Sequence, residues 1–276
     1  FPMGTFHFSG INVAYIMDRW QGKLAVVTGA SAGIGSAVCV ALANCGLKVV
    51  GLARRAQLID KLQSLVKGNG SIVSRQCDVA NVQELVAAFK WIEEQFGCVH
   101  VMINNAGVLH DGQVTDVGNK PLSDAALIST IDVNLKGSVL CTKYAIASMN
   151  RHGFDGHVIT INSITGHYVP IAPGFNVYPS TKHAITAFSL SLATELAHFK
   201  SSIKTTVTYG RLVGLIFKCL HSIVYFYLSK TTLRTLDLGS KLVEARRTKL
   251  KLLTKISIVN ITNLKFCIIM LVCPVK

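Results

Sequence analysis

Thr28-Gly29-Ala30-Ser31-Ala32-Gly33-Ile34-Gly35 is the stretch that decides the fold of this 276-residue chain. It follows a short apolar run, residues 23–28, and opens into a segment rich in Ala and Val, residues 34–45. Glycines between a strand and a helix let the backbone turn tightly, approach a ligand closely and pack the helix against the sheet. The helix N-terminus offers free N–H groups, so the stretch predicts a phosphate-binding loop.

The alternation of apolar runs and helical segments continues from this loop to residue 208. The predicted strands are residues 23–28, 48–53, 71–78, 99–104, 157–162 and 203–208, and the predicted helices are residues 34–45, 56–66, 82–96, 121–148 and 178–199. Strands that alternate with helices of this length predict an α/β fold, a Rossmann-like doubly wound parallel sheet with helices on both faces. We expect one domain, residues 17–208, after an N-terminal extension, residues 1–16, that does not resemble a signal peptide.

Charge is distributed unevenly along the chain. The formal net charge is +14. Residues 1–206 hold 16 Lys and Arg against 12 Asp and Glu, whereas residues 207–276 hold 12 against 2. The body of the protein is therefore nearly neutral, which argues against a nucleic-acid partner.

The predicted tail, residues 209–276, is basic and apolar and breaks the earlier rhythm. Its two apolar stretches, residues 212–228 and 256–275, contain charged or amide side chains, including Lys218 and Lys265. A Lys in the middle of a membrane helix costs about 2.5–3.5 kcal/mol, so a membrane span is disfavoured. A membrane-tethered protein remains one alternative interpretation of this tail.

Eight cysteines are spread through the chain, and no pair has the C-x-x-C spacing of a zinc or redox site. Most lie in apolar runs. Buried free thiols are typical of a reducing compartment, so we expect a cytoplasmic protein. The histidines His157, His167 and His183 also lack ligand spacing, and we expect no metal.

Two arginines, Arg54 and Arg55, follow the second predicted strand. In dinucleotide folds, an acidic residue at this place binds a ribose hydroxyl, whereas an arginine accommodates a 2′-phosphate. The guanidinium group suits phosphate geometry. The pair therefore predicts NADP(H) as the cofactor, and solvated surface charge is the alternative interpretation.

Three ordered motifs carry a family resemblance. The glycine spacing G-x-x-x-G-x-G after Thr28, the run Asn104-Asn105-Ala106-Gly107 and the run Tyr178-Pro179-Ser180-Thr181-Lys182 occur in the order of the classical short-chain dehydrogenase/reductase family. The chain is similar to that family over roughly residues 20–208. The resemblance implies catalytic roles for Asn134, Ser163, Tyr178 and Lys182, and cofactor binding by Gly29, Ala30, Ser31, Ala32, Gly33, Ile34, Gly35, Arg54, Arg55, Asp78, Val79, Asn105, Ala106, Gly107, Tyr178 and Lys182. Family members are usually homo-oligomers.

A tyrosine and a lysine four residues apart, Tyr178 and Lys182, lie on one face of a predicted helix. A free Tyr has a pKa of about 10 and is a poor base at neutral pH, but a nearby ammonium favours the phenolate. By resemblance, Lys182 also holds the nicotinamide ribose, Ser163 binds the substrate oxygen, and Asn134 anchors a water that relays protons to Lys182.

The segment of residues 164–177 between Ser163 and Tyr178 is mostly apolar, which favours a hydrophobic substrate. The chain looks like the farnesol dehydrogenase-like branch of the family, which is akin to the dehydrogenase/reductase member-eleven proteins. This implies NADP-dependent interconversion of an isoprenoid alcohol and its carbonyl compound, or else reduction of keto-steroids and related carbonyls.

The family pattern ends near residue 208, because the Pro-Gly loop that follows the sixth strand in the family is replaced by Tyr209-Gly210-Arg211. Without the family's later elements, we expect an open sheet edge and a doubtful oligomer interface. The tail is either a natural segment or translated non-coding sequence. For the chain as a whole, an alternative to an active enzyme is an NADP-binding remnant without catalytic activity.

Overall fold

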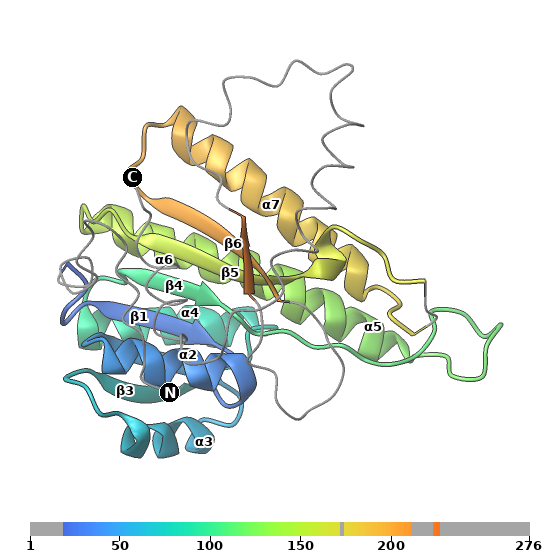
Figure 1. Ribbon diagram of the computed structural model, residues 1–276, viewed down its shortest axis with the longest axis horizontal. Coiled ribbons are helices and arrows are strands. Elements are labelled where there is room, and N and C mark those ends of the chain that lie inside the picture. The colour runs from blue at the N-terminus through green and yellow to red at the C-terminus, as the bar shows by residue number, and fades with distance from the viewer. Residues whose placement is uncertain (1–18, 172–173, 211–222, 227–276) are drawn as a thin grey trace, which may run out of the picture.

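A single seven-stranded sheet dominates the computed structural model, which describes residues 19–171, 174–210 and 223–226 (Figure 1). Its strand order is β3-β2-β1-β4-β5-β6-β7. The strands are β1 (Leu24–Thr28), β2 (Lys48–Ala53), β3 (Ser71–Gln76), β4 (Val101–Asn104), β5 (His157–Ser163), β6 (Lys204–Gly210) and β7 (Ile223–Phe226). The first six run parallel, which confirms the predicted α/β doubly wound fold.

Helices cover both faces of the sheet because alternate strand residues point to opposite sides. They are α2 (Gly33–Asn44), α3 (Gln57–Asp60), η1 (Lys61–Leu65), α4 (Val82–Phe96), α5 (Asp124–Ile131), η2 (Asp132–Gly137), α6 (Ser138–Arg151), η3 (Ile164–Gly166) and α7 (Tyr178–His198). Ala25 and Val27 of β1 pack with α2 in one core cluster, whereas Leu24 and Val26 pack with α4, α6 and α7 in the other. In Figure 1, α2 lies in front of the sheet and α4 and α6 lie behind it.

Two predicted helices are interrupted in the structure. Residues 56–66 form the short α3 followed by the 3₁₀-helix η1, and residues 121–148 are divided into α5, the π-helix η2 and α6. The start of α5 is set by Ser123, whose Oγ accepts a hydrogen bond from the Ala126 N–H at 3.3 Å. No helix within the described ranges has the length and apolar character to cross a membrane.

The predicted open edge at the sixth strand is wrong. The strand β7 pairs antiparallel with β6, from Val207↔Phe226 to Gly210↔Ile223. Unpaired N–H and C=O groups of an edge strand attract another strand, and the β-branched and aromatic residues of Ile223–Phe226 suit one. The rest of the two apolar tail stretches lies outside the described residues.

The switch point of the sheet lies between β1 and β4, which are neighbours although the chain places two strands between them. Chain connections run in opposite directions from this point, which leaves a crevice at the carboxyl ends of the two strands. The loops after Thr28 and Asn104 therefore meet there, as the predicted motifs require.

The imidazole of His100 lies at the amino ends of β1 and β4 and joins them by a hydrogen bond. Its Nδ1 accepts a hydrogen bond from the Leu24 N–H at 3.1 Å, so the ring is neutral at that nitrogen. Burial, with Lys23 and His152 adding to its effect, lowers the pKa of His100 to about 4. The ring also packs edge-on against Phe154, with ring centres 4.4 Å apart.

We expect His100 to make the fold sensitive to acid. Between its ordinary pKa of 6.5 and its folded pKa of about 4, the unfolded chain binds a proton that the folded protein does not, so stability falls as pH falls. Urea midpoints measured across this window are expected to fall more steeply for the parent than for His100→Gln, whose amide oxygen accepts without titrating. Parallel curves would contradict this prediction.

Candidate active site

The loop between β1 and α2 has the backbone geometry that the glycine spacing predicts. Gly29 and Gly33 have φ values of +65° and +59°, a left-handed conformation that disfavours side chains. A Cβ on Gly35 would collide with the Gly29 carbonyl oxygen and with the Asn105 amide. The glycines therefore permit both the turn and the close approach of α2 to the sheet.

The loop after β4 is fastened to this glycine loop. The N–H groups of Asn105 and Ala106 both donate to Thr28 Oγ1 at 3.0 Å. The Asn105 side-chain amide donates to the carbonyl oxygens of Thr28, at 2.9 Å, and of Gly29, at 3.3 Å. Sequence reasoning assigned Asn105 to cofactor binding, whereas its amide is committed to joining the two loops.

A pocket of about 340 Å³ opens at this switch point. Predicted cofactor residues that line it are Gly29, Ser31, Ala32, Ile34, Arg54, Arg55, Asp78, Val79, Asn105, Ala106 and Gly107. The predicted residues Ala30, Gly33, Gly35, Tyr178 and Lys182 do not line it. Lining residues that sequence reasoning missed are Leu52, Ala53, Cys77, Val108 and Val133. All but Leu52 lie next to a predicted site residue, a proximity that could have identified them.

The charged groups of the pocket favour an anion. The side chains of Arg54 and Arg55 are exposed, and neither forms an ion pair with any described residue. The Asp78 carboxylate is partly engaged, because it accepts a hydrogen bond from the Ala80 N–H at 2.9 Å. Two guanidinium groups at the end of β2 are thus available to a phosphate.

A tyrosine, a lysine and a serine come together where β5 meets α7. Tyr178, Lys182 and Ser163 are 8%, 6% and 3% exposed. The Lys182 Nζ lies 5.7 Å from the centre of the Tyr178 ring and donates to the Ile161 carbonyl oxygen at 3.2 Å. Helix α7 starts at Tyr178 itself, with Pro179 in its first turn, where a missing N–H costs nothing.

Asn134 lies inside the π-helix η2 and is buried. Its Oδ1 accepts from the Val108 N–H at 2.7 Å, and its Nδ2 donates to the Val108 carbonyl at 2.9 Å and to Thr181 Oγ1 at 3.2 Å. A Cβ built on Gly107 would lie 3.4 Å from Asn134 Oδ1 and 3.9 Å from Lys182 Nζ. Gly107 of the loop after β4 therefore lies close to both Asn134 and Lys182.

Comparison with known proteins agrees with this geometry. The family model described as short chain dehydrogenase matches residues 23–210. The chain belongs to the short-chain dehydrogenase family. The resemblance predicted from the motifs is thereby confirmed, and the chain is an oxidoreductase of that family.

Individual relatives in the family are moderately similar. Farnesol dehydrogenase of Aedes aegypti is 41% identical over 192 residues, 69% of this chain and 77% of that protein. Dehydrogenase/reductase SDR family member 11 of Mus musculus is 36% identical over 194 residues, 69% of this chain and 73% of that protein. A metagenomic short-chain oxidoreductase crystallised with NADP has a TM-score of 0.60 and 28% identity, covering 70% of this chain and 82% of its own.

Burial changes the acid–base properties of this short-chain dehydrogenase's site. It raises the pKa of Tyr178, and a hydrogen bond with Ser163 partly opposes that rise. Burial lowers the pKa of Lys182 to about 8. The pKa of the phenol therefore moves in the direction opposite to the one expected from a nearby lysine, because loss of hydration outweighs the hydrogen bond with Ser163.

Two positioning residues of this dehydrogenase were missed from the sequence. Asn162 donates from Nδ2 to the Lys182 carbonyl at 3.1 Å and to Thr186 Oγ1 at 3.0 Å, which holds α7 against β5. Thr181 Oγ1 donates to the Tyr178 carbonyl at 2.7 Å. Asn162 stands beside Ser163, and Thr181 lies within the Tyr178–Lys182 motif, but only their contacts show that they position other groups. In the part of the chain that the structure describes, no group of His, Cys, Asp or Glu could hold a metal ion.

Proposed function

We propose that this protein interconverts an apolar alcohol, of the farnesol-like isoprenoid class, and its carbonyl compound with NADP(H). The observation that carries the proposal is the approach of Tyr178, Ser163 and Lys182 to one another. Gly107, which lies near Lys182, also lines the pocket that contains Arg54 and Arg55. The names of the relatives support the alcohol and carbonyl chemistry.

Tyr178 is the proposed acid and base. In alcohol oxidation, its ionised oxygen takes the hydroxyl proton of the substrate, and in reduction the phenol returns that proton to the carbonyl oxygen. Ser163 donates a hydrogen bond to the same substrate oxygen. The bound nicotinamide supplies or accepts the hydride.

Lys182 and Asn134 support the phenol. A lysine whose pKa is about 8 exchanges its proton near neutral pH, and its charged form stabilises the phenolate. The side-chain amide of Asn134 is occupied by Val108 and Thr181. The backbone carbonyl oxygen of Asn134 accepts from Ser138 Oγ at 3.0 Å, and the proposed relay water would bind beside it.

The pocket fits a dinucleotide with an extra phosphate. A Cβ on Gly29 or Gly35 of its glycine loop would collide with neighbouring atoms, and the start of α2 offers free backbone N–H groups to phosphates. Arg54 and Arg55 would hold the 2′-phosphate, and Asp78 and Val79 would contact the adenine side. The NADP complex of a structural neighbour supports this choice over NAD.

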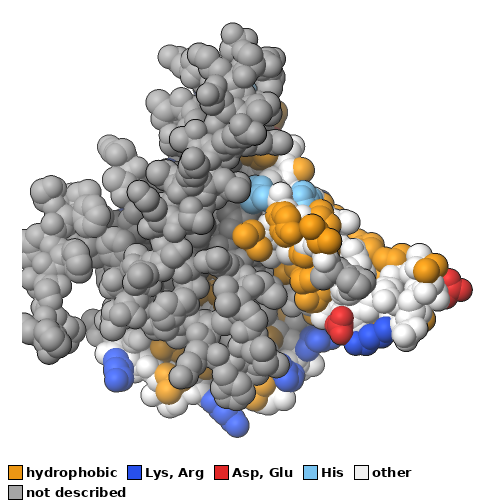
Figure 2. Space-filling model, turned by 45° about the vertical axis from the view of Figure 1, so that its right-hand side comes forward, with side chains coloured by type: hydrophobic (Ala, Val, Ile, Leu, Met, Phe, Trp, Pro, Cys, Tyr) orange, Lys and Arg blue, Asp and Glu red, His pale blue; other side chains and the backbone are white. Residues whose placement is uncertain are grey.

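Apolar side chains support a hydrophobic substrate. In the segment after β5, Tyr168, Val169 and Ile171 are 53%, 60% and 97% exposed. Figure 2 shows hydrophobic side chains gathered on one face of the described part of the molecule. Their exposure is costly in water unless an apolar ligand or surface covers them.

A substrate panel tests the function. With NADP⁺, we expect farnesol to be oxidised faster than short polar alcohols, with NADPH formation followed by absorbance. A keto-steroid with NADPH tests the alternative carbonyl reductase. Binding of NADPH, seen by fluorescence, without turnover of any substrate would identify the non-catalytic remnant and contradict the proposal.

We further propose that the domain spans residues 17–208 and works in the cytoplasm. The family match to residues 23–210 supports the first statement. The five described cysteines, Cys39, Cys45, Cys77, Cys98 and Cys141, are free, which supports a reducing compartment.

A further inference from the structure

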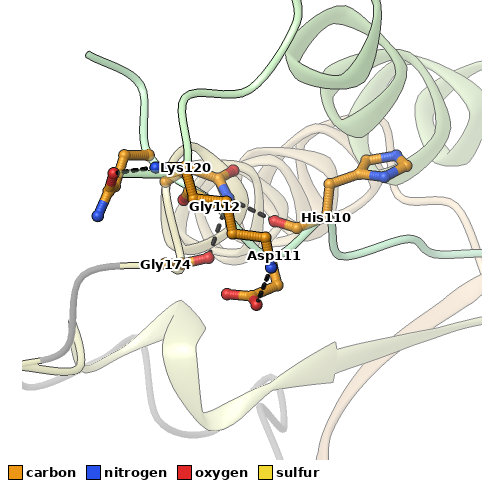
Figure 3. Close-up of polar contacts among 7 residues, drawn as sticks. His110, Asp111, Gly112, Lys120 and Gly174 are labelled. Atoms are coloured by element: carbon orange, nitrogen blue, oxygen red, sulfur yellow. Dashed lines mark hydrogen bonds and ion pairs between the residues drawn. The ribbon is translucent and has the colours of Figure 1, made fainter. Parts of the chain in front are cut away.

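A single asparagine bridges the two loops that border the catalytic tyrosine. Asn176 lies two residues before Tyr178, and its Nδ2 donates to the carbonyl oxygens of His110 at 2.6 Å, Gly174 at 3.1 Å and Gly112 at 3.4 Å. Figure 3 shows the backbone groups of His110 and Gly174 converging beside Gly112. Residues 110 and 112 belong to the loop after β4, whereas residue 174 belongs to the segment after β5.

Further contacts join the same two loops. The Gly112 N–H donates to the Gly174 carbonyl at 3.4 Å. Within the first loop, Lys120 Nζ forms an ion pair with Asp111 at 2.6 Å (Figure 3), but both side chains are exposed, so that pair adds little. The partly buried amide of Asn176 is therefore the main polar connection between the loops.

The bridge closes a ring of hydrogen bonds around the site. Val108 lies two residues before His110 in the same loop. Its N–H donates to Asn134 Oδ1, and its carbonyl oxygen accepts from Asn134 Nδ2. Asn134 donates to Thr181, and Thr181 donates to the Tyr178 carbonyl. Tyr178 is thus held on its C-terminal side through Thr181 and on its N-terminal side through Asn176.

We infer that Asn176 is a positioning residue, which sets the place of the Tyr178 hydroxyl by tying the start of α7 to the loop after β4. This inference rests on the proposed function, in which Tyr178 transfers the proton. A helix start is otherwise free to shift, because its first N–H groups lack partners within the helix. Reacting groups must be held closely, and a displacement of about 1 Å costs about 10²-fold in rate.

The backbone conformation of Asn176 offers a second explanation for an asparagine at this position, which experiment can distinguish from the positioning role. Its φ is +41°, in the left-handed region that asparagine tolerates better than most residues. Its Oδ1 also accepts from the Val177 N–H at 2.7 Å, which stabilises the local turn. A residue kept only for its positive φ could be replaced by glycine without loss, since glycine adopts positive φ freely, and Asn176→Asp keeps the acceptor for the Val177 N–H.

Asn176→Gly therefore removes the amide and keeps the backbone. We expect kcat to fall about tenfold or more, with the midpoint of its pH profile displaced and the Kd for NADPH unchanged. Asn176→Asp keeps the acceptor for Val177 but turns a carboxylate toward the three carbonyl oxygens, so its loss is expected to be larger. Asn150→Asp, the same change at an exposed position near the end of α6, is the matched control.

Hydrogen exchange gives a readout that does not depend on turnover. In Asn176→Gly, amides of residues 105–112 and 174–182 are expected to exchange faster than in the parent, while those of β1 and β2 do not change. Unchanged exchange would overturn the inference even in a protein that turns over no substrate. Faster exchange with parental kcat and pH profile would also overturn it, because the bridge would then serve stability alone.

Failure of the proposed function looks different. In that case the parent itself oxidises none of the alcohols and reduces none of the carbonyl compounds, although it binds NADPH. Failure of the inference leaves the parent active and the glycine variant equal to it.

Discussion

Replacing Tyr178 with Phe is expected to lower kcat/KM for alcohol oxidation and carbonyl reduction by about 10²–10⁴-fold, the range that a positioned acid or base contributes. The variant removes one oxygen from a buried ring and leaves the rest of the side chain in place. Binding of NADPH is expected to persist, because Tyr178 does not line the pocket that holds the glycine loop and the two arginines.

Tyr144→Phe is the matched control for this change. Tyr144 lies on α6, with its ring centre 5.4 Å from that of Phe89, and does not line the pocket, so removal of its hydroxyl should leave kcat/KM near the parental value. Steady-state rates and NADPH fluorescence, measured on both variants, separate loss of chemistry from loss of cofactor. Parental activity in Tyr178→Phe would remove the proposed acid and base.

The rates of oxidation and reduction should depend on pH in opposite ways, because they need opposite protonation states of Tyr178, whose pKa is raised by burial. Oxidation requires the ionised phenol, so its rate should increase as pH rises toward that pKa. Reduction requires the protonated phenol, so its rate should decrease over the same range. Both pH dependences are expected to be absent in Tyr178→Phe.

The second large effect is expected from the arginines at the end of β2. Replacing Arg54 and Arg55 together with Ala should raise the Kd for NADPH about 100-fold, since each charge-assisted hydrogen bond to phosphate contributes about 1.5–3 kcal/mol and about 1.4 kcal/mol is tenfold. The Kd for NADH, which lacks the 2′-phosphate, should change little. Fluorescence titration with both cofactors measures the two constants.

A variant with the same loss of charge controls for the overall field. Lys61 and Lys67 are exposed, and neither lines the pocket. Their double replacement with Ala should leave both cofactor affinities near parental values at physiological salt, where exposed charges are screened within about 8 Å. Equal weakening of NADPH and NADH in the arginine variant would indicate a general charge effect and contradict the assignment.

The structure also explains why the contacts of two predicted site residues, Asn134 and Asn105, could not be predicted. A helix was expected over residues 121–148, and the amphipathic pattern gives no sign of the π-helix at Asp132–Gly137. Inside it, Asn134 contacts Val108 and Thr181, residues far from it along the chain. The role of Asn105 in joining two loops likewise depends on Thr28, 77 residues earlier.

The chain's own pattern determined the α/β class, the phosphate loop and the Tyr–Lys pair, because strand alternation, glycine spacing and the helical repeat are local properties. Tertiary structure alone decided the rest. Strand β7 covers an edge that local pattern left open, and Asn176 meets the loop after β4 only once both loops are folded. The direction of the Tyr178 pKa was decided in the same way, since hydration is lost only when the surrounding chain closes over the ring.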